Sequence, residues 1–404
     1  MGKDWTPGAA RRFSQAEYED RWARVYAEMR RRGYETAVVW GKSAGTYERS
    51  MDMLYLTNFY SSHSGQEPDT PAFQARSFSG TILHAGEEPE VHSDEFAPRL
   101  DRMATERHVP HLDPIKGVAD ALRARGIEGK VAWVGGDVLP VKYGKQIEAA
   151  LPGIEFVYED DLVATVRRVK SPAELEVFRE AGDIADAAMT EVMNALTMGR
   201  TEAEAAGAGI AELMRRGGGF QRVSISHGAL CHMPESSPMY GFSTTAPEPG
   251  EMFHVFVWGP ILEGYWLDPG RTGVCGGKPT PEQRRLVEDC ARILEEGIEA
   301  KVRPGANMAE ITRSAMAIHD AVRGDRCEYD ANWPYYGHSN GCMWEQPLLN
   351  LDCLTGDEVY QENMVCSSEA FLTREGVGTA TFENNFIVTR DGIEMVTKIP
   401  MYWW

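Results

Sequence analysis

The chain has 404 residues, of which 43% are hydrophobic and 25% charged, which is the composition of a globular protein with a sizeable core. Its formal charge of −20 argues against a nucleic-acid partner, since binding to a phosphate backbone depends on an excess of Lys and Arg. No apolar run approaches the roughly 18 residues that span a membrane, and the first residues lack the apolar stretch of a secretory signal. The seven cysteines show no CxxC pattern that would indicate a zinc site or a disulfide framework. We therefore expect a cytoplasmic protein without nucleic-acid or membrane partners.

The first half of the chain alternates between helix and strand signals. Ser14 and Glu17 form a capping-box pattern that begins a helix, which runs to about Arg32. Four short apolar segments are typical of strands: 37–40, 79–84, 131–134 and 155–158. Helical stretches lie between several of them, so we expect a small α/β domain over residues 1–167.

The second half groups its strands and helices instead of alternating them. Ser171-Pro172-Ala173-Glu174 combines a capping box with Pro at the first helical position, and a long amphipathic stretch follows to about Leu196. Further helix starts are predicted at Thr201, Thr280 and Asn307. Strand-like segments lie at 220–226, 252–258, 264–267 and from 335 onward. This grouping predicts an α+β domain over residues 168–404.

Four residues of the second half are candidate metal ligands: Asp268, His338, Glu369 and Glu383. Three carboxylates and one imidazole suit a divalent ion such as Mn, Fe(II), Co or Zn. Their separations along the chain are large, so spacing alone does not bring them together. Each residue taken singly is also compatible with a surface carboxylate or a hydrogen-bonded histidine.

Several motifs occur in an order that is known from one superfamily. In chain order they are Arg168-Val169-Lys170-Ser171-Pro172-Ala173-Glu174-Leu175, Gly264-Tyr265-x-x-Asp268-x-x-Arg271-Thr272, Gly337-His338-x-x-Gly341 with Trp344-Glu345-x-Pro347, and the segments around Glu369 and Glu383. Together they resemble the pita-bread superfamily, which includes methionine aminopeptidase, aminopeptidase P, prolidase, creatinase and dimethylsulfoniopropionate lyase. The resemblance implies a pita-bread catalytic domain over residues 168–404, preceded by a smaller creatinase-like N-terminal domain. It also implies that the four candidate ligands share one metal site.

One departure from the family pattern concerns the number of metal ions. Dinuclear members carry a further Asp eleven residues before the position of Asp268, where this chain has Val257. Because that Asp serves mainly the second ion, the resemblance implies a site for one ion. A metal-free pocket like that of creatinase, in which His and Glu act as acid and base, is the alternative. Creatinase has lost the counterpart of Asp268, which this chain keeps.

Two histidines that contact the peptide bond in peptidase members also have no counterpart here. The stretch aligned with the first ends in Tyr240, and His232 lies a few residues upstream; the second is replaced by Trp344. The catalytic candidates are therefore His232, Tyr240 and two carboxylates that could move a proton, Glu369 and Glu345.

Aromatic residues cluster around the site motifs. Trp258, Trp266, Tyr336 and Trp344 are candidates for a pocket that accommodates a cationic group, although each is also compatible with simple packing. Arg76 lies where creatinase places a carboxylate-binding arginine from the partner subunit's small domain. The resemblance thus implies a homodimer whose site is completed by the N-terminal domain of the partner; a solvated loop arginine is the alternative.

The leading functional expectation is a single-metal hydrolase of a C–N bond in a small zwitterionic or cationic metabolite. The first alternative is a lyase that removes a sulfonium or amine group beside a carboxylate, as in dimethylsulfoniopropionate lyase. The second alternative is an inactive binding module on the same fold.

Overall fold

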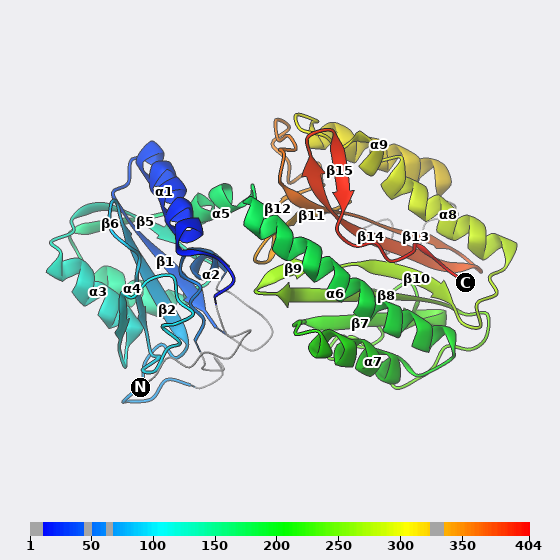
Figure 1. Ribbon diagram of the computed structural model, residues 1–404, viewed down its shortest axis with the longest axis horizontal. Helices are drawn as coiled ribbons and strands as arrows, with labels where there is room; N and C mark the ends of the chain where they lie inside the picture. Colours follow the sequence, from blue (N-terminus) through cyan, green and yellow to red (C-terminus); the bar gives the residue numbers. More distant parts are fainter. Residues whose placement is uncertain (1–10, 44–50, 62–67, 324–334) are drawn as a thin grey trace. The chain divides into compact units, whose positions relative to one another are not determined.

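The computed structural model describes residues 11–43, 51–61, 68–323 and 335–404. The chain divides into two compact units, Met1–Arg167 and Arg168–Trp404. Each unit contains its own sheet and is described separately below (Figure 1). Within the described residues, no helix is both long and apolar enough to cross a lipid bilayer.

The first unit is built on a six-stranded sheet in the order β4-β3-β2-β1-β5-β6. Its strands are β1 (Thr36–Lys42), β2 (Phe78–His84), β3 (Glu90–Ser93), β4 (His108–Pro110), β5 (Gly129–Val134) and β6 (Ile154–Tyr158). Its helices are α1 (Gln15–Arg32), α2 (Met51–Thr57), α3 (Pro114–Ala124), α4 (Val141–Ala150) and α5 (Leu162–Arg167). β1 pairs in parallel with β5 and antiparallel with β2, so the sheet is mixed. Its core contains Trp40 and Trp133, whose ring centroids are 5.5 Å apart.

The second unit contains a ten-stranded sheet whose main path runs β12-β11-β13-β14-β10-β8-β7. These strands are β7 (Arg222–His227), β8 (Met252–Leu262), β10 (Gly270–Val274), β11 (His338–Asn340), β12 (Trp344–Leu348), β13 (Val365–Arg374) and β14 (Gly378–Thr389). Three strands pair off this path: β9 (Tyr265–Leu267), β15 (Gly392–Met395) and β16 (Tyr402–Trp403). The helical elements are α6 (Pro172–Thr197), α7 (Glu202–Arg215), η1 (Gly228–Leu230), α8 (Pro281–Glu295), η2 (Glu299–Lys301) and α9 (Met308–Val322). The predicted α+β class of this half and α/β class of the first half are both confirmed.

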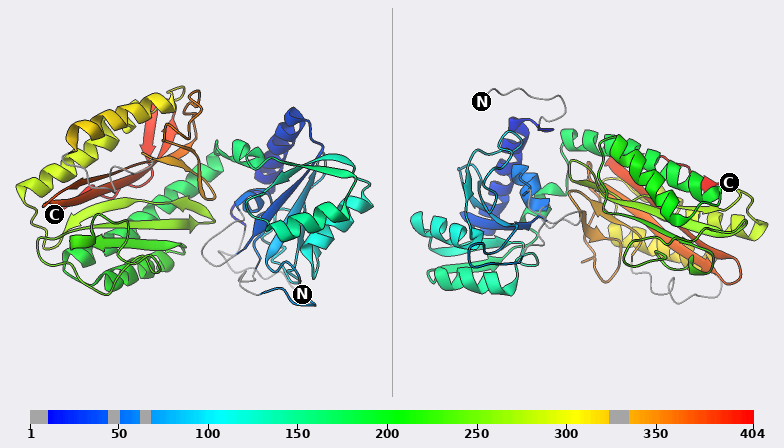
Figure 2. Two further views of the ribbon diagram at one scale, coloured as in Figure 1. Left: turned by 180° about the vertical axis from the view of Figure 1, so that it is seen from behind. Right: turned by 90° about the horizontal axis from the view of Figure 1, so that it is seen from below.

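All four α-helices that the structure describes in this unit begin where the sequence predicts, α9 directly after its N-cap Asn307. Capping boxes at Ser171, Thr201 and Thr280 bond the first turns of α6, α7 and α8, because each side chain accepts from the third helical N–H and the Glu or Gln there bonds back. α6 packs against β8, α7 against β7, and α8 against β13 and β14 (Figures 1 and 2).

The register of the sheet decides which side chains share a face. Glu369 of β13 lies directly across from Glu383 of β14, and Glu383 lies across from Gly270 of β10. Ala370 and Phe382 alternate with these glutamates and belong to the core that contains α8 and α9. Since neighbouring strand residues point to opposite faces, Glu369 and Glu383 point to the face away from these helices.

Candidate metal centre

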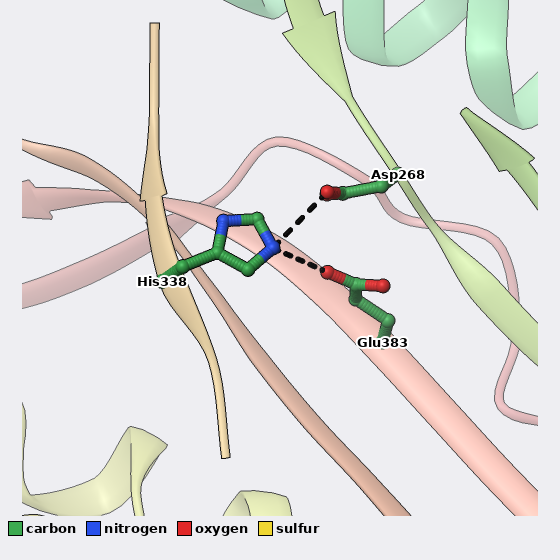
Figure 3. A group of neighbouring side chains, drawn as sticks. All are labelled: Asp268, His338 and Glu383. Carbon is green, nitrogen blue, oxygen red and sulfur yellow. Dashed lines mark ion pairs between the residues drawn. The ribbon is translucent and has the colours of Figure 1, made fainter. Parts of the chain in front are cut away.

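Three of the four candidate ligands come together in the second unit. Nε2 of His338 lies 3.1 Å from Oδ2 of Asp268 and 3.2 Å from Oε1 of Glu383 (Figure 3). One ligand atom from each residue lies within 4.8 Å of the others, and all three residues are buried. Asp268 follows β9, His338 begins β11 and Glu383 lies within β14, so three separate strands position the group. One nitrogen and two oxygens at this spacing fit the coordination shell of a divalent ion.

The orientation of the His338 ring supports this fit. Nδ1 lies 3.0 Å from the carbonyl oxygen of Ser339, to which it donates. In the neutral ring, Nε2 then carries the lone pair and directs it toward two carboxylate oxygens. A lone pair facing two anionic oxygens is repulsive unless a proton or a metal ion lies between them. The donor set of this pocket therefore fits a metal ion.

Two asparagines hold the carboxylate of Asp268. Asn385 Nδ2 donates to Oδ1 of Asp268 at 2.6 Å, and Asn340 Nδ2 donates to the same oxygen at 3.1 Å. The N–H of Asp268 in turn donates to Oδ1 of Asn385 at 3.3 Å. Oδ1 is thus occupied by amide donors, which leaves Oδ2 to face His338. Our sequence analysis missed both asparagines, although they follow His338 and Glu383 by two positions and therefore share their strand faces.

Glu369 lies beside this trio rather than within it. It faces the same side of the sheet as Glu383, and its side chain is buried. Among the described residues, no hydrogen-bond partner reaches its Oε1. A buried carboxylate oxygen without a donor is costly, so this atom is suited to a ligand or a proton.

The electrostatics of the cluster also favour a bound cation. The pKa of Glu369 is raised to about 8, mainly by burial; the charge of His338 opposes this rise and the charge of Asp268 adds to it. Burial, followed by the charges of Asp268 and Glu369, holds the pKa of Glu383 well above its usual range. Burial opposes the charged form of His338, but Asp268 and Glu383 together outweigh it and raise the pKa of His338. Three buried carboxylates with one imidazole thus lack positive charge, which a divalent ion would supply.

Glu345, one of the two carboxylates predicted to move a proton, lies outside this cluster. It pairs with Ser339, which alternates with His338 along β11, so its side chain lies on the face opposite to His338. Its Oε2 is 3.5 Å from Nζ of Lys170, and both side chains are buried. Its face follows from the pairing of Glu345 with Ser339 across the turn between β11 and β12, which the sequence does not reveal.

The candidates His232 and Tyr240 also lie outside the cluster. Nδ1 of His232 contacts the carbonyl oxygen of Ala229 at 3.0 Å, and the residue lines a cavity of about 610 Å³ beside Thr379. Thr379 precedes Glu383 by four positions on β14, and four residues of extended strand span roughly 13 Å. The cavity beside Thr379 that His232 lines is therefore separate from the cluster around Glu383. Tyr240 is 65% exposed in the segment between η1 and β8.

The candidate substrate-binding residues separate into two groups. The Trp344 ring lies 4.8 Å from the His338 ring, and Trp258 and Trp266 lie 6.0 Å apart near Asp268. Tyr336 instead bonds to His319 of α9, with its hydroxyl 2.9 Å from Nδ1, and therefore packs on the helix side of the sheet. Arg76 belongs to the first unit, where its Nε donates to Asp94 at 2.8 Å. Contact between Arg76 and a substrate in a second subunit stays a prediction.

An antiparallel sheet that presents Asp, His and two Glu on one face, away from its helices, defines a metallohydrolase of the pita-bread class. Residues 176–390 match metallopeptidase family M24, and the chain belongs to this family. The predicted superfamily is thereby confirmed.

Relatives and solved structures agree with this assignment. The chain is 25% identical to the putative dipeptidase YkvY of Bacillus subtilis, over 89% of this chain and 94% of the relative. It is 27% identical to an Xaa-Pro dipeptidase of Lactobacillus delbrueckii subsp. lactis, over 70% and 75% of the two chains. The crystal structure of dipeptidase PepE from Mycobacterium ulcerans superposes with a TM-score of 0.74 at 23% identity, covering 96% of this chain and 98% of that one. The prolidase of Pyrococcus horikoshii superposes with a TM-score of 0.73 at 19% identity, covering 95% and 100%.

Proposed function

We propose that this protein hydrolyses the C–N bond of a small zwitterionic substrate, with dipeptides as the first class to test. The observation that carries the proposal is Nε2 of His338, which faces carboxylate oxygens of Asp268 and Glu383 in a buried pocket. Membership of a metallopeptidase family supports metal-dependent hydrolysis. Relatives named as dipeptidases support a small substrate.

We propose further that the site holds one divalent ion, of Mn, Fe, Co or Zn, bound by Asp268, His338, Glu369 and Glu383. A carboxylate that bridges two ions must offer both of its oxygens. Oδ1 of Asp268 is instead occupied by the amides of Asn340 and Asn385. Val257, at the position of the family's additional Asp, is fully buried and has no ligating atom. Both features support a mononuclear site over a dinuclear one.

The residues around this site divide the chemical work. When bound, the ion lowers the pKa of a water molecule toward about 7 and polarises the carbonyl oxygen of the substrate. The unpartnered Oε1 of Glu369 would accept the proton that the attacking water loses and would return it to the nitrogen as the C–N bond breaks. Ser339 fixes the His338 ring through its carbonyl oxygen, and the ring of Trp344 shields it from one side.

The two alternatives receive less support. No relative reported above is named as a carbon–sulfur lyase, and the dipeptidases favour hydrolysis. An inactive binding module would not need the preserved trio of ligands. A cytoplasmic location and a homodimer completed by the partner's N-terminal domain stay predictions.

An assay of amine release tests the proposed reaction. The protein, loaded in turn with Mn, Fe, Co and Zn, would be incubated with Xaa-Pro dipeptides, creatine, ectoine-like compounds and dimethylsulfoniopropionate. We expect amine release from at least one dipeptide, and a loss of about 100-fold or more in Glu369→Gln because that variant has no general base. Glu375→Gln, an exposed change in the turn between β13 and β14, is the matched control and should keep full activity.

Two results would contradict the proposal. Cleavage of dimethylsulfoniopropionate without any amine-releasing activity would establish the lyase alternative. Failure of every metal-loaded form to release an amine would exclude the hydrolysis of these compounds.

A further inference from the structure

Arg222 lies on the same sheet face as the metal ligands, two strands away from Asp268. In the register of β7 and β8, Arg222 is directly across from Trp258. On β8, Trp258 lies between Phe256, which pairs with Gly270, and Gly259, which pairs with Leu267. Asp268 lies between those two partners, so Trp258 is placed across from Asp268. Cross-strand neighbours share a face, and two strand spacings amount to roughly 10 Å. Arg222, Trp258 and Asp268 thus form a row across the sheet.

The guanidinium of Arg222 is fixed from one side only. Its Nη1 donates to both carboxylate oxygens of Glu235, at 2.7 and 2.9 Å, and lies 3.2 Å from the carbonyl oxygen of Pro238. Ser224 donates to Glu235 at 3.0 Å and accepts from the indole nitrogen of Trp258 at 3.0 Å. The guanidinium carbon lies 5.9 Å from the centre of the Trp258 ring. Glu235, Ser224 and Trp258 therefore hold the group in a defined orientation.

The opposite edge of this guanidinium remains available. Within the described part of the chain, Nε and Nη2 of Arg222 make no hydrogen bond, and the side chain is 28% exposed. These two nitrogens form the edge that binds a carboxylate through two parallel N–H donors. An arginine can bridge two carboxylates in this way because it carries five N–H donors, of which Glu235 engages only the pair on Nη1.

We propose that Arg222 and Trp258 form the subsite for the free carboxylate of the substrate, an inference that rests on the proposed function. Nε and Nη2 of Arg222 bind the two carboxylate oxygens, and the Trp258 ring covers the adjoining apolar part of the substrate. Two extended residues span about 7 Å. The strands that carry Arg222 and Asp268 are roughly 10 Å apart. A dipeptide can therefore connect the two residues, because their side chains cover the rest of that distance. The substrate class is a small peptide or N-substituted amino acid with a free carboxyl end.

Kinetics with matched acid and amide substrates test this subsite. The substrate would be the Xaa-Pro dipeptide that the wild type cleaves best, together with its C-terminal amide. In Arg222→Met, we expect KM for the acid to rise on the order of 10- to 100-fold, since a bidentate charged interaction is lost. We expect kcat to stay within about threefold and KM for the amide to stay unchanged, because only uniform binding of the carboxylate is removed. Arg222→Lys keeps the charge but cannot donate two parallel hydrogen bonds, so its KM for the acid should lie between those of the wild type and Arg222→Met.

A binding measurement separates this inference from the proposed reaction. Calorimetric titration with L-proline and L-prolinamide needs no turnover, and the wild type should prefer proline while Arg222→Met should not. Arg216→Met, a change at an exposed arginine that pairs with Glu212, is the matched control. If Arg222→Met lost equal affinity for the acid and the amide, or lost affinity for neither, the subsite would be overturned even if the wild type is an active dipeptidase. If the wild type cleaves no dipeptide but Arg222→Met still loses its preference for proline, the reaction is wrong and the subsite stands.

Discussion

At the scale of single residues, the behaviour of the site depends on how Asp268 is held. Its carboxylate faces His338 on one side, where we propose that it binds the metal, and accepts two amide hydrogen bonds on the other. Groups that orient a ligand raise metal affinity by about 10- to 100-fold, because they remove the ligand's freedom to turn away. The asparagines therefore belong to the functional site although neither touches the expected ion.

Asn385→Ala tests this role. The variant removes the 2.6 Å hydrogen bond to Oδ1 of Asp268, and we expect metal affinity to fall about 10- to 100-fold. Asn384→Ala is the control, because Asn384 points to the other face and bonds Glu299 at 2.8 Å. Competition with a chelator of known affinity gives both dissociation constants. Equal metal affinities in the two variants would show that the hydrogen bond from Asn385 to Asp268 does not contribute to metal binding.

The residues that sequence analysis found and missed differ in a physical way. His338 and the carboxylates carry chemistry in their own side chains, so their motifs were recognisable. Asn340 and Asn385 act only through Asp268, and their importance follows from strand alternation rather than from residue type. Glu345 pairs with Ser339 and lies on the face opposite to His338, a placement that depends on the pairing of β11 with β12 and not on residue type.

At the scale of elements, helix starts were predictable and strand pairing was not. Capping boxes are local, so Ser171, Thr201 and Thr280 mark the starts of α6, α7 and α8 in the sequence itself. The pairing of Glu369 with Glu383 depends on the hairpin of β13 and β14, and that of Arg222 with Trp258 depends on strands separated by a long connection. Periodicity along one segment indicates which of its residues share a face, but it does not identify the residues of another strand with which they pair.

The connection between β7 and β8 has its own anchor, the buried Glu202 at the start of α7. Its carboxylate accepts from Nδ1 of His227 at 2.6 Å, from the hydroxyl of Ser236 at 2.7 Å and from the N–H of Ser243. These bonds fix both ends of the segment that carries Glu235, the partner of Arg222. Glu202 thus links the fold of α7 to the geometry of the proposed carboxylate subsite.

Glu202→Ala should destabilise the second unit by about 2–4 kcal/mol, because three donors lose a buried charged acceptor. Urea unfolding measures the loss of stability, and hydrogen exchange should show faster exchange at residues 236–245. Glu191→Ala, an exposed change on α6, should stay within about 0.5 kcal/mol of the wild type. Wild-type stability in Glu202→Ala would mean that the connection is held by other contacts.

At the scale of the whole molecule, the two units divide structure and chemistry between them. The family match covers residues 176–390, which lie entirely in the second unit, and all ligands of the proposed ion lie there as well. The sequence could predict that helices and strands alternate in the first half and are grouped in the second, because this distinction depends only on the order of elements. The excess of acidic residues argues against nucleic acid as a partner class but could not indicate a metal, since most of those carboxylates lie elsewhere.

The metal content of the purified protein tests the central claim most directly. After loading with Mn, Fe, Co or Zn and removal of free ions, elemental analysis should find one divalent ion per chain in the wild type. His232→Ala, which changes an exposed histidine outside the cluster, should keep that ion, and His338→Ala should lose it together with activity because the ligand at the centre of the cluster is gone. Two ions per chain, a wild type that cannot be loaded, or an ion that persists in His338→Ala would contradict the account.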